Sequence, residues 1–220
     1  MDMERARFNM VEQQIRPWRV LDAAVLAAHL HLRREDFVPP SMLNLAFSDV
    51  EIPLIIDGQD TGERMLSPKV DARLVQSLEV RRGESVLEIG TGSGWLAALL
   101  ADRAMRVVSL EIDPNIAAFA RENLARQGIS QVEVKQANAA KGIEGQWDVI
   151  VASGGLELVP EFLLAALKPG GRLAVIVGKA PIMQAQCISK LHNGSFHTVN
   201  LFETMTPMLH DFPKATRFSL

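Results

Sequence analysis

The stretch that decides the fold is VLEIGTGSGW, residues Val86–Trp95. An apolar run typical of a buried strand leads directly into three alternating glycines, Gly90, Gly92 and Gly94, and then into a predicted helix. Glycine lets the backbone turn tightly and approach a ligand closely where a side chain would clash. The stretch therefore predicts a strand, a loop and a helix that together bind a nucleotide-type cofactor.

Three residues around the loop bear on which nucleotide binds. Trp95 stands where the dinucleotide fingerprint G-x-G-x-x-G has its last glycine, and it is far too large for the close helix–strand packing that this glycine permits. Glu88 precedes the loop and suits a cationic ligand, because a further anion beside a pyrophosphate would be repulsive. Glu111 ends the next predicted strand, where a carboxylate can accept from both ribose hydroxyls of an adenosine. This last feature serves NAD and S-adenosylmethionine equally, but the first two disfavour NAD.

Outward from this stretch, short apolar runs alternate with longer periodic ones, which predicts a parallel sheet with connecting helices. We expect strands at 85–89, 106–110, 132–135, 147–152 and 172–177, and helices at 95–103, 114–127 and 160–168. Two further strands, 185–191 and 195–202, are joined at Asn193-Gly194, a strong signal for an antiparallel hairpin. Residues 3–79 read as helical segments, among them a helix after Asp22 and one after Ser67, with loop chemistry over 51–62.

We therefore expect one compact domain made of two parts. Residues 1–79 would form an N-terminal helical region with a loop that covers the substrate and cofactor, and residues 80–220 would form the cofactor-binding core. The chain of 220 residues, with 48% hydrophobic and 22% charged residues, has the average composition of a globular protein.

The charge and the cysteine content of the chain argue against several classes of function. The net charge is −3 and no basic block is present, so we expect neither a nucleic-acid nor a membrane partner. Cys187 is the single cysteine, which excludes an internal disulfide and a multi-thiolate zinc site, and the five histidines show no metal-ligand pattern. No metal is expected. The charged N-terminus lacks the apolar region of a signal peptide, so a cytoplasmic location is expected.

The sequence resembles the class I S-adenosylmethionine-dependent methyltransferases, whose first motif is an acidic residue followed by G-x-G-x-G. Within that class it is similar to the protein-L-isoaspartate O-methyltransferase family over almost the whole chain. The segments that carry this likeness are MVEQQ (10–14), EDFVPP (35–40), DGQ (57–59), Ser67, VLEIGTGSG (86–94), WDVIVA (147–152), LKPGGRL (167–173) and TPML (206–209). The expected fold is α/β: a Rossmann-like, doubly wound and mostly parallel sheet with helices on both faces, an N-terminal helical extension and a C-terminal antiparallel hairpin.

The resemblance implies S-adenosyl-L-methionine as the cofactor and assigns parts of the site to it. The Gly90–Gly94 backbone would lie along the methionine part, Glu111 would take the ribose, and Asn138 would contact the adenine amino group. The full set of expected cofactor-binding residues is Leu66, Ser67, Glu88, Gly90, Thr91, Gly92, Ser93, Gly94, Glu111, Ile112, Asn138 and Ala139. Ser67 is also the expected catalytic residue, beside the reactive methyl and the substrate carboxylate; the alternative is an ordinary helix N-cap.

The implied activity is methylation of isoaspartyl carboxylates in damaged proteins or peptides, a protein-repair reaction. Two alternatives stay open. A methyltransferase derived from the family could use a different small-molecule or protein acceptor, because the chain has Met65–Lys69 (MLSPK) where the family has Thr-Ile-Ser-x-Pro. A binding or regulatory protein could keep the cofactor fold without catalysis.

Overall fold

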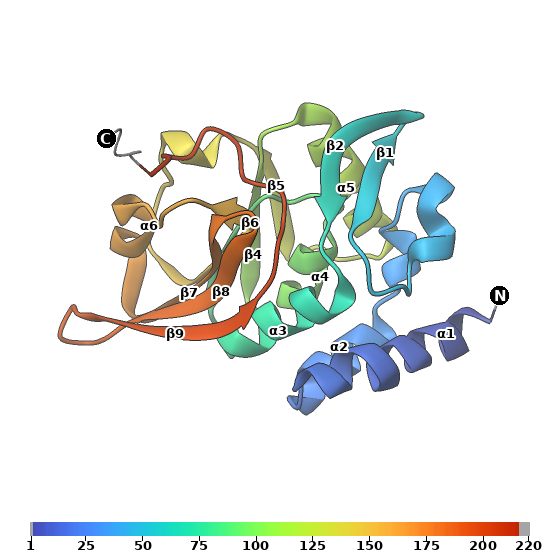
Figure 1. The fold of residues 1–220 in the computed structure, drawn as a ribbon, viewed down its shortest axis with the longest axis horizontal. Coiled ribbons are helices and arrows are strands. Elements are labelled where there is room, and N and C mark those ends of the chain that lie inside the picture. The colour runs from blue at the N-terminus through green and yellow to red at the C-terminus, as the bar shows by residue number, and fades with distance from the viewer. Residues whose placement is uncertain (1, 216–220) are drawn as a thin grey trace.

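The computed structural model describes residues 2–215, and its centre is a seven-stranded sheet of order β5-β4-β3-β6-β7-β8-β9 (Figure 1). Strands β3 to β7 are parallel, and β8 and β9 are added antiparallel at one edge. The bounds are Ser85–Ile89 (β3), Arg106–Glu111 (β4), Val132–Gln136 (β5), Trp147–Leu156 (β6), Leu167–Lys179 (β7), Ile182–Lys190 (β8) and Phe196–Glu203 (β9). All seven strands expected from the sequence are present, and the expected fold class is confirmed.

Helices cover both faces of this sheet. Within β3, Val86 belongs to the apolar core on one face and Leu87 to the core on the other, as the alternation of side chains along a strand requires. The first face is covered by α3 (Pro68–Leu78), α4 (Trp95–Ala101) and α5 (Pro114–Arg126), and the second by α6 (Glu161–Ala165) and the region around Phe212. Burial on both faces explains why the central strands read as continuous apolar runs.

One helix boundary differs from the expectation. A helix was expected over 160–168, but α6 ends at Ala165 because Leu167 already pairs with Trp147 at the start of β7. Pairing between neighbouring strands thus overrides the helical periodicity of the sequence at this point.

The N-terminal part begins with α1 (Met3–Met10), which continues as a π-helical turn (Val11–Ile15), and includes α2 (Ala23–His31). Asp22 caps α2, since its carboxylate accepts from the backbone N–H of Ala24 at 2.8 Å, as expected from the sequence. Figure 1 shows α1 and α2 far from the turn between β8 and β9, while Trp18, which precedes α2, meets Phe202 of β9 edge-on. Within residues 2–215, no helix is long and apolar enough to cross a membrane.

The prediction of a loop over 51–62 is wrong, because this region forms an antiparallel hairpin. Its strands are β1 (Ile52–Ile56) and β2 (Gln59–Met65). The turn between them is Asp57-Gly58, and both residues have positive φ, 50° and 77°. Two positive φ values are the requirement of a type I′ hairpin turn, for which Asp-Gly is a favoured pair. The dipeptide was in the sequence, but Pro53 and the charged residues of β2 concealed the flanking strands.

The C-terminal hairpin is confirmed, with the Asn193-Gly194 turn joining β8 to β9. After β9 the chain returns across the carboxyl ends of the parallel strands (Figure 1). It is held there by backbone hydrogen bonds from Gly155 N–H to the Pro207 carbonyl, at 2.8 Å, and from Leu209 N–H to the Gly155 carbonyl, at 2.9 Å. We call residues 204–212 the C-terminal segment.

Candidate functional site

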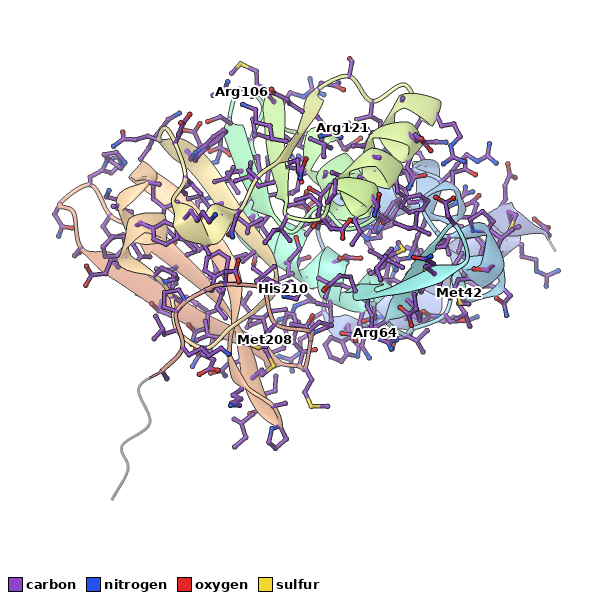
Figure 2. The ribbon with its side chains drawn as sticks, turned by 90° about the horizontal axis from the view of Figure 1, so that it is seen from above. Met42, Arg64, Arg106, Arg121, Met208 and His210 are labelled. Carbon is purple, nitrogen blue, oxygen red and sulfur yellow. The ribbon has the colours of Figure 1, made fainter. Side chains whose placement is uncertain are left out.

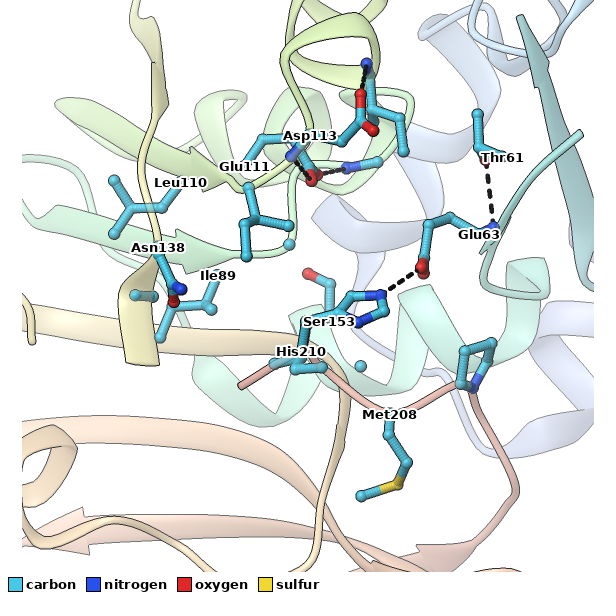
Figure 3. Close-up of a pocket in the computed structure, with 18 of the residues that line it drawn as sticks. Thr61, Glu63, Ile89, Leu110, Glu111, Asp113, Asn138, Ser153, Met208 and His210 are labelled. Atoms are coloured by element: carbon cyan, nitrogen blue, oxygen red, sulfur yellow. Dashed lines mark hydrogen bonds and ion pairs between the residues drawn. The ribbon is translucent and has the colours of Figure 1, made fainter. Parts of the chain in front are cut away.

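A cavity of about 430 Å³ opens at the carboxyl ends of β3 and β4, between the β1–β2 hairpin and the C-terminal segment (Figure 3). The carboxyl edge of an open parallel sheet is where this class of fold binds its ligands. The lining includes Leu54, Thr61, Glu63 and Arg64 of the hairpin, Gly90, Gly92, Glu111, Ile112, Asn138, Ala139 and Ser153 of the core, and Pro207, Met208, Leu209, His210 and Phe212 near the C-terminus.

The glycine loop has the conformation that its sequence predicted. Gly90, Gly92 and Gly94 all have positive φ, of 90°, 53° and 84°. A Cβ added to Gly90 would lie 3.0 Å from Leu209 Cδ2, so a side chain would also close the gap between the loop and the C-terminal segment. The loop therefore needs glycine for backbone conformation and for space.

Glu111 lies at the end of β4 and is buried, with 6% exposure. Its Oε2 accepts from Gly92 N–H at 3.0 Å and its Oε1 from Asp113 N–H at 3.1 Å, so the loop and the start of α5 fix the carboxylate in place (Figure 3). Burial raises the pKa of Glu111, and these backbone donors oppose the rise. Each oxygen keeps a second acceptor position, which fits the expected bonds from the ribose hydroxyls.

The far end of the cavity is suited to an adenine ring. Ile112, Ala139 and Phe212 contribute apolar surface there. Asn138 Oδ1 accepts from Ala140 N–H at 3.0 Å, and its Nδ2 donates to Asp211 Oδ2 at 2.6 Å. The side chain of Asn138 is thus oriented from both ends, and the second lone pair of Oδ1 would accept from the adenine amino group.

A second, smaller cavity of about 40 Å³ lies behind the glycine loop. It shares Arg64, Gly90, Gly92 and Ser153 with the main cavity, and its lining is completed by Met65, Leu66, Asp71, Glu88, Thr91, Ser93, Trp95 and Leu96. Six of the expected site residues therefore meet here: Leu66, Glu88, Gly90, Thr91, Gly92 and Ser93. We call it the inner cavity.

Glu88 is completely buried at the inner cavity. Its two oxygens accept from the hydroxyls of Ser109 and Ser153. Burial raises the pKa of Glu88 to about 8, the two hydroxyl donors lower it, and the nearby carboxylates of Asp71 and Glu111 raise it further. A carboxyl group held in this way gains most from a cationic ligand, which is the ligand type expected for this position.

Trp95 does not pack between α4 and β3 in the manner of a fingerprint glycine. Its ring meets His29 and Phe37 edge-on, with centroids 5.8 Å and 5.4 Å away, and the Arg34 guanidinium lies over it at 5.4 Å. The large residue after the loop therefore joins the core to the N-terminal part. This placement agrees with the sequence argument against a dinucleotide site.

Ser67 is buried and stands at the N-cap position of α3, but its hydroxyl makes no capping hydrogen bond. It follows Leu66, which lines the inner cavity, while Ser67 itself is absent from the lining of both cavities. Gly94 is likewise outside both linings, and packs against Leu124 of α5. The other ten expected site residues line one cavity or both.

The hairpin and the C-terminal segment meet above the main cavity. His210 Nε2 lies 2.7 Å from Glu63 Oε1, which joins β2 to the C-terminal segment (Figure 3). The hydrogen bond from Glu63 raises the pKa of His210. Figure 2 shows His210, Met208 and Arg64 on this side of the molecule. The sequence reasoning passed over this pair, because nothing local in the sequence relates residues so far apart.

Sequence reasoning also missed Asp71 and Ser153, although each left a signal. Asp71 falls in the apolar stripe of α3 together with Leu74, Val75 and Leu78, and a charged residue on a buried stripe has a partner or a ligand. Ser153 follows the predicted strand at 147–152, at the carboxyl edge where ligands bind.

The residues present fit S-adenosylmethionine. Glu111 suits the ribose, the apolar surface around Ile112 suits the adenine, and the inner cavity next to Glu88 suits a small cationic group. Among residues 2–215, no group of three or more His, Cys, Asp or Glu residues is arranged to hold a metal ion.

Replacement of Glu111 by alanine should weaken cofactor binding. Charged hydrogen bonds of this kind contribute roughly 1.5 to 3 kcal/mol, so we expect an increase of about 10- to 100-fold in the dissociation constant for S-adenosylhomocysteine. Isothermal titration calorimetry measures this constant directly. An unchanged dissociation constant would remove Glu111 from the ribose site.

Comparison with known proteins identifies the family. The chain matches the family model described as Protein-L-isoaspartate(D-aspartate) O-methyltransferase (PCMT) over residues 5–208. A protein-L-isoaspartate O-methyltransferase from Methanoculleus marisnigri is 41% identical over 79% of this chain and 78% of that protein. A protein-L-isoaspartate O-methyltransferase 2 from Marinobacter nauticus is 37% identical over 89% of this chain and 88% of that protein.

Solved structures agree with this result. A protein-L-isoaspartate O-methyltransferase of 25% identity superposes with a TM-score of 0.77 and covers 92% of this chain; this chain spans 65% of that longer one. A PCMT structure from Plasmodium falciparum in complex with S-adenosyl-L-homocysteine has the same fold, with a TM-score of 0.76 at 19% identity over 95% of this chain and 98% of that one. The chain therefore belongs to the protein-L-isoaspartate(D-aspartate) O-methyltransferase family.

Proposed function

We propose that the chain transfers a methyl group from S-adenosylmethionine to the isoaspartyl carboxylate of damaged proteins or peptides. The observation that carries the proposal is the cavity between Glu111 and the C-terminal segment, in a chain of this family. The cavity has one end suited to an adenosine and another that reaches the inner cavity, where Glu88 lies.

The reaction requires little acid–base chemistry from the protein. S-Adenosylmethionine, when bound, supplies an electrophilic methyl group on a sulfonium. A substrate carboxylate is already anionic at neutral pH, so no general base is needed. The protein's contribution is then to align the carboxylate with the methyl group and to exclude water. The site fits this requirement, since hydrogen bonds hold the carboxylates of Glu111 and Glu88 where they would bind the cofactor.

We further propose that the substrate enters between the β1–β2 hairpin and the C-terminal segment. Arg64 is the charged residue shared by both cavity linings within the described part of the chain, and it would attract the substrate carboxylate. The Glu63–His210 contact spans the same gap and marks one border of the entrance. Residues 1–79 would then act as the covering part and residues 80–220 as the cofactor-binding core. The proposed location is the cytoplasm, with which the single cysteine is compatible.

Ser67 keeps its proposed role of orienting the substrate carboxylate, on the strength of its place next to Leu66 at the inner cavity. Ser67→Ala should leave the affinity for S-adenosylhomocysteine unchanged within about twofold and lower turnover by about tenfold or more, because one lost hydrogen bond contributes about 1 to 2 kcal/mol. Steady-state kinetics beside calorimetry separates the two quantities. Equal turnover in the variant would leave Ser67 with a structural role only.

The experiment that tests the proposed function is a radioactive methyl-transfer assay with an isoaspartyl peptide and the matching aspartyl peptide as the control. We expect transfer to the isoaspartyl peptide alone. No transfer above the control, with normal cofactor binding, would overturn the isoaspartyl substrate and favour a different acceptor, for which the MLSPK segment at Met65–Lys69 is the motivation. Absence of cofactor binding would overturn both enzyme proposals.

A further inference from the structure

The inner cavity holds two carboxylates that come from different elements. Glu88 comes from β3 and Asp71 from α3, and both are buried, with 0% and 2% exposure. They are close enough for the charge of Asp71 to raise the pKa of Glu88. Two acids buried around so small a volume repel each other when both are ionised, so a cation between or beside them would favour the ionised pair.

Within residues 2–215, the buried cation beside these two acids is Arg34; Arg64 also lines the inner cavity, but it is exposed. Arg34 is completely buried, and its Nη1 donates to Asp71 Oδ2 at 3.1 Å. Its other donors go to the backbone carbonyls of Ala46, at 3.1 Å, and Leu66, at 2.8 Å, so none is directed to Glu88. In the described part of the chain, the hydrogen-bond partners of Glu88 are the hydroxyls of Ser109 and Ser153. With both acids ionised, the pair and Arg34 together carry one net negative charge.

Two further features point to a ligand. Asp71 Oδ1 accepts no hydrogen bond from residues 2–215, although the side chain is almost fully buried. Trp95 also lines the inner cavity, and its Nε1 is buried without a hydrogen-bond partner in that part of the chain. A buried donor without a partner is costly, and beside the open acceptor position of Asp71 it indicates that a polar group completes the cavity.

The volume and the polarity of the inner cavity indicate which ligand group could occupy it. About 40 Å³ suits an ammonium or a water molecule and excludes a ring. The inner cavity and the main cavity both have Gly90 and Gly92 in their linings, and these glycines belong to the loop along which the methionine part is expected. The lining of the inner cavity therefore complements the α-amino acid end of a ligand. Its ammonium would lie beside the two acids, and its carboxylate would lie beside donors such as Trp95 Nε1.

We propose that Asp71 is a second anionic ligand, beside Glu88, for the ammonium of the cofactor's amino-acid end, and that Arg34 positions it. The proposal rests on the proposed cofactor of this chain and adds a contact from the covering part of the protein. It differs from a purely structural Arg34–Asp71 ion pair in one respect. A structural pair affects all ligands of the site alike, whereas an ammonium ligand distinguishes those that carry the amino group from those that lack it.

The test measures binding of three probes to the full chain by calorimetry. They are S-adenosylhomocysteine, its analogue with hydrogen in place of the α-amino group, and 5′-methylthioadenosine, which lacks the whole amino-acid end. Asp71→Asn keeps an acceptor for Arg34 and removes the charge. We expect this variant to bind S-adenosylhomocysteine about 10-fold or more weakly and the other two probes within about twofold of the parent. Asp49→Asn is the matched control, since Asp49 pairs with Lys69 outside both cavities.

Unchanged binding of S-adenosylhomocysteine by Asp71→Asn, or equal weakening of all three probes, would overturn the proposal. If the variant does not fold, the parent protein still tests the ammonium site on which the proposal depends: the analogue without the amino group should bind about 100-fold more weakly than S-adenosylhomocysteine, and equal affinity would overturn that site. Each result concerns binding alone. A chain that shows this selectivity but methylates no isoaspartyl peptide would overturn the proposed function and leave this inference standing.

Discussion

Glu88→Gln should make the protein without cofactor more stable at pH 8 and bind the cofactor more weakly. Burial raises the pKa of Glu88 from 4.5 to about 8. The folded state therefore holds a proton that the unfolded chain releases, so the stability associated with Glu88 falls as the pH rises from about 4.5 to about 8. Glutamine does not titrate, so the variant escapes this loss. The difference in unfolding free energy should grow from about 1 kcal/mol at pH 5 to on the order of 4 kcal/mol at pH 8.

Urea denaturation of parent and variant across this pH range measures the difference, because the titrating groups that do not interact with Glu88 cancel. Glu133→Gln is the control: Glu133 is an exposed glutamate on β5, and its replacement should change stability by less than about 0.5 kcal/mol. In parallel, the affinity of Glu88→Gln for S-adenosylhomocysteine should fall about 10- to 100-fold, because the ammonium loses a charged partner. A pH-independent difference in stability would contradict the buried, proton-holding state of Glu88.

Arg34→Met should be the most destabilising of these changes. Arg34 is completely buried and joins three carboxyl or carbonyl groups from different elements, on Ala46, Leu66 and Asp71. Methionine has a similar length but no donor, so the variant leaves Asp71 as a buried charge without its partner. Breaking a buried pair in this way costs about 3 to 5 kcal/mol.

A second substitution separates the lost pair from lost packing. In the Arg34→Met background, Asp71→Asn removes the unpaired carboxylate, so the double variant should recover part of the loss. Urea midpoints of the single and double variants give the comparison at constant slope. A loss below about 1 kcal/mol in Arg34→Met, or a double variant less stable than the single one, would show that the ion pair does not hold α3 to the N-terminal part.

The fold was predictable to the extent that its signals were local. The strand, glycine loop and helix at Val86–Trp95 and the turn at Asn193-Gly194 were identified because glycine positions and apolar periodicity are visible within ten residues. The β1–β2 hairpin was missed because its strands carry Pro53 and a run of polar residues, and only pairing in three dimensions makes them strands. Tertiary context overrides weak local preference at such places.

The residues of the candidate site also fall into two groups, those predicted from local sequence signals and those that only tertiary packing brings to the site. Glu88, Glu111 and the glycines follow from the order of elements at the carboxyl edge of a parallel sheet. Asp71 and His210 come from elements distant in the sequence, and their relation to the site depends on how the covering part and the C-terminal segment pack. A charged residue in the apolar stripe of α3 was the one local sign of the inner cavity.

A crystal structure of the protein with S-adenosylhomocysteine would show directly how the cofactor binds. We expect the ribose hydroxyls to donate to Glu111, the ammonium to lie in the inner cavity between Glu88 and Asp71, and the sulfur to face the gap between the hairpin and the C-terminal segment. A ligand with its ribose turned away from Glu111 and its ammonium in solvent would contradict this binding mode.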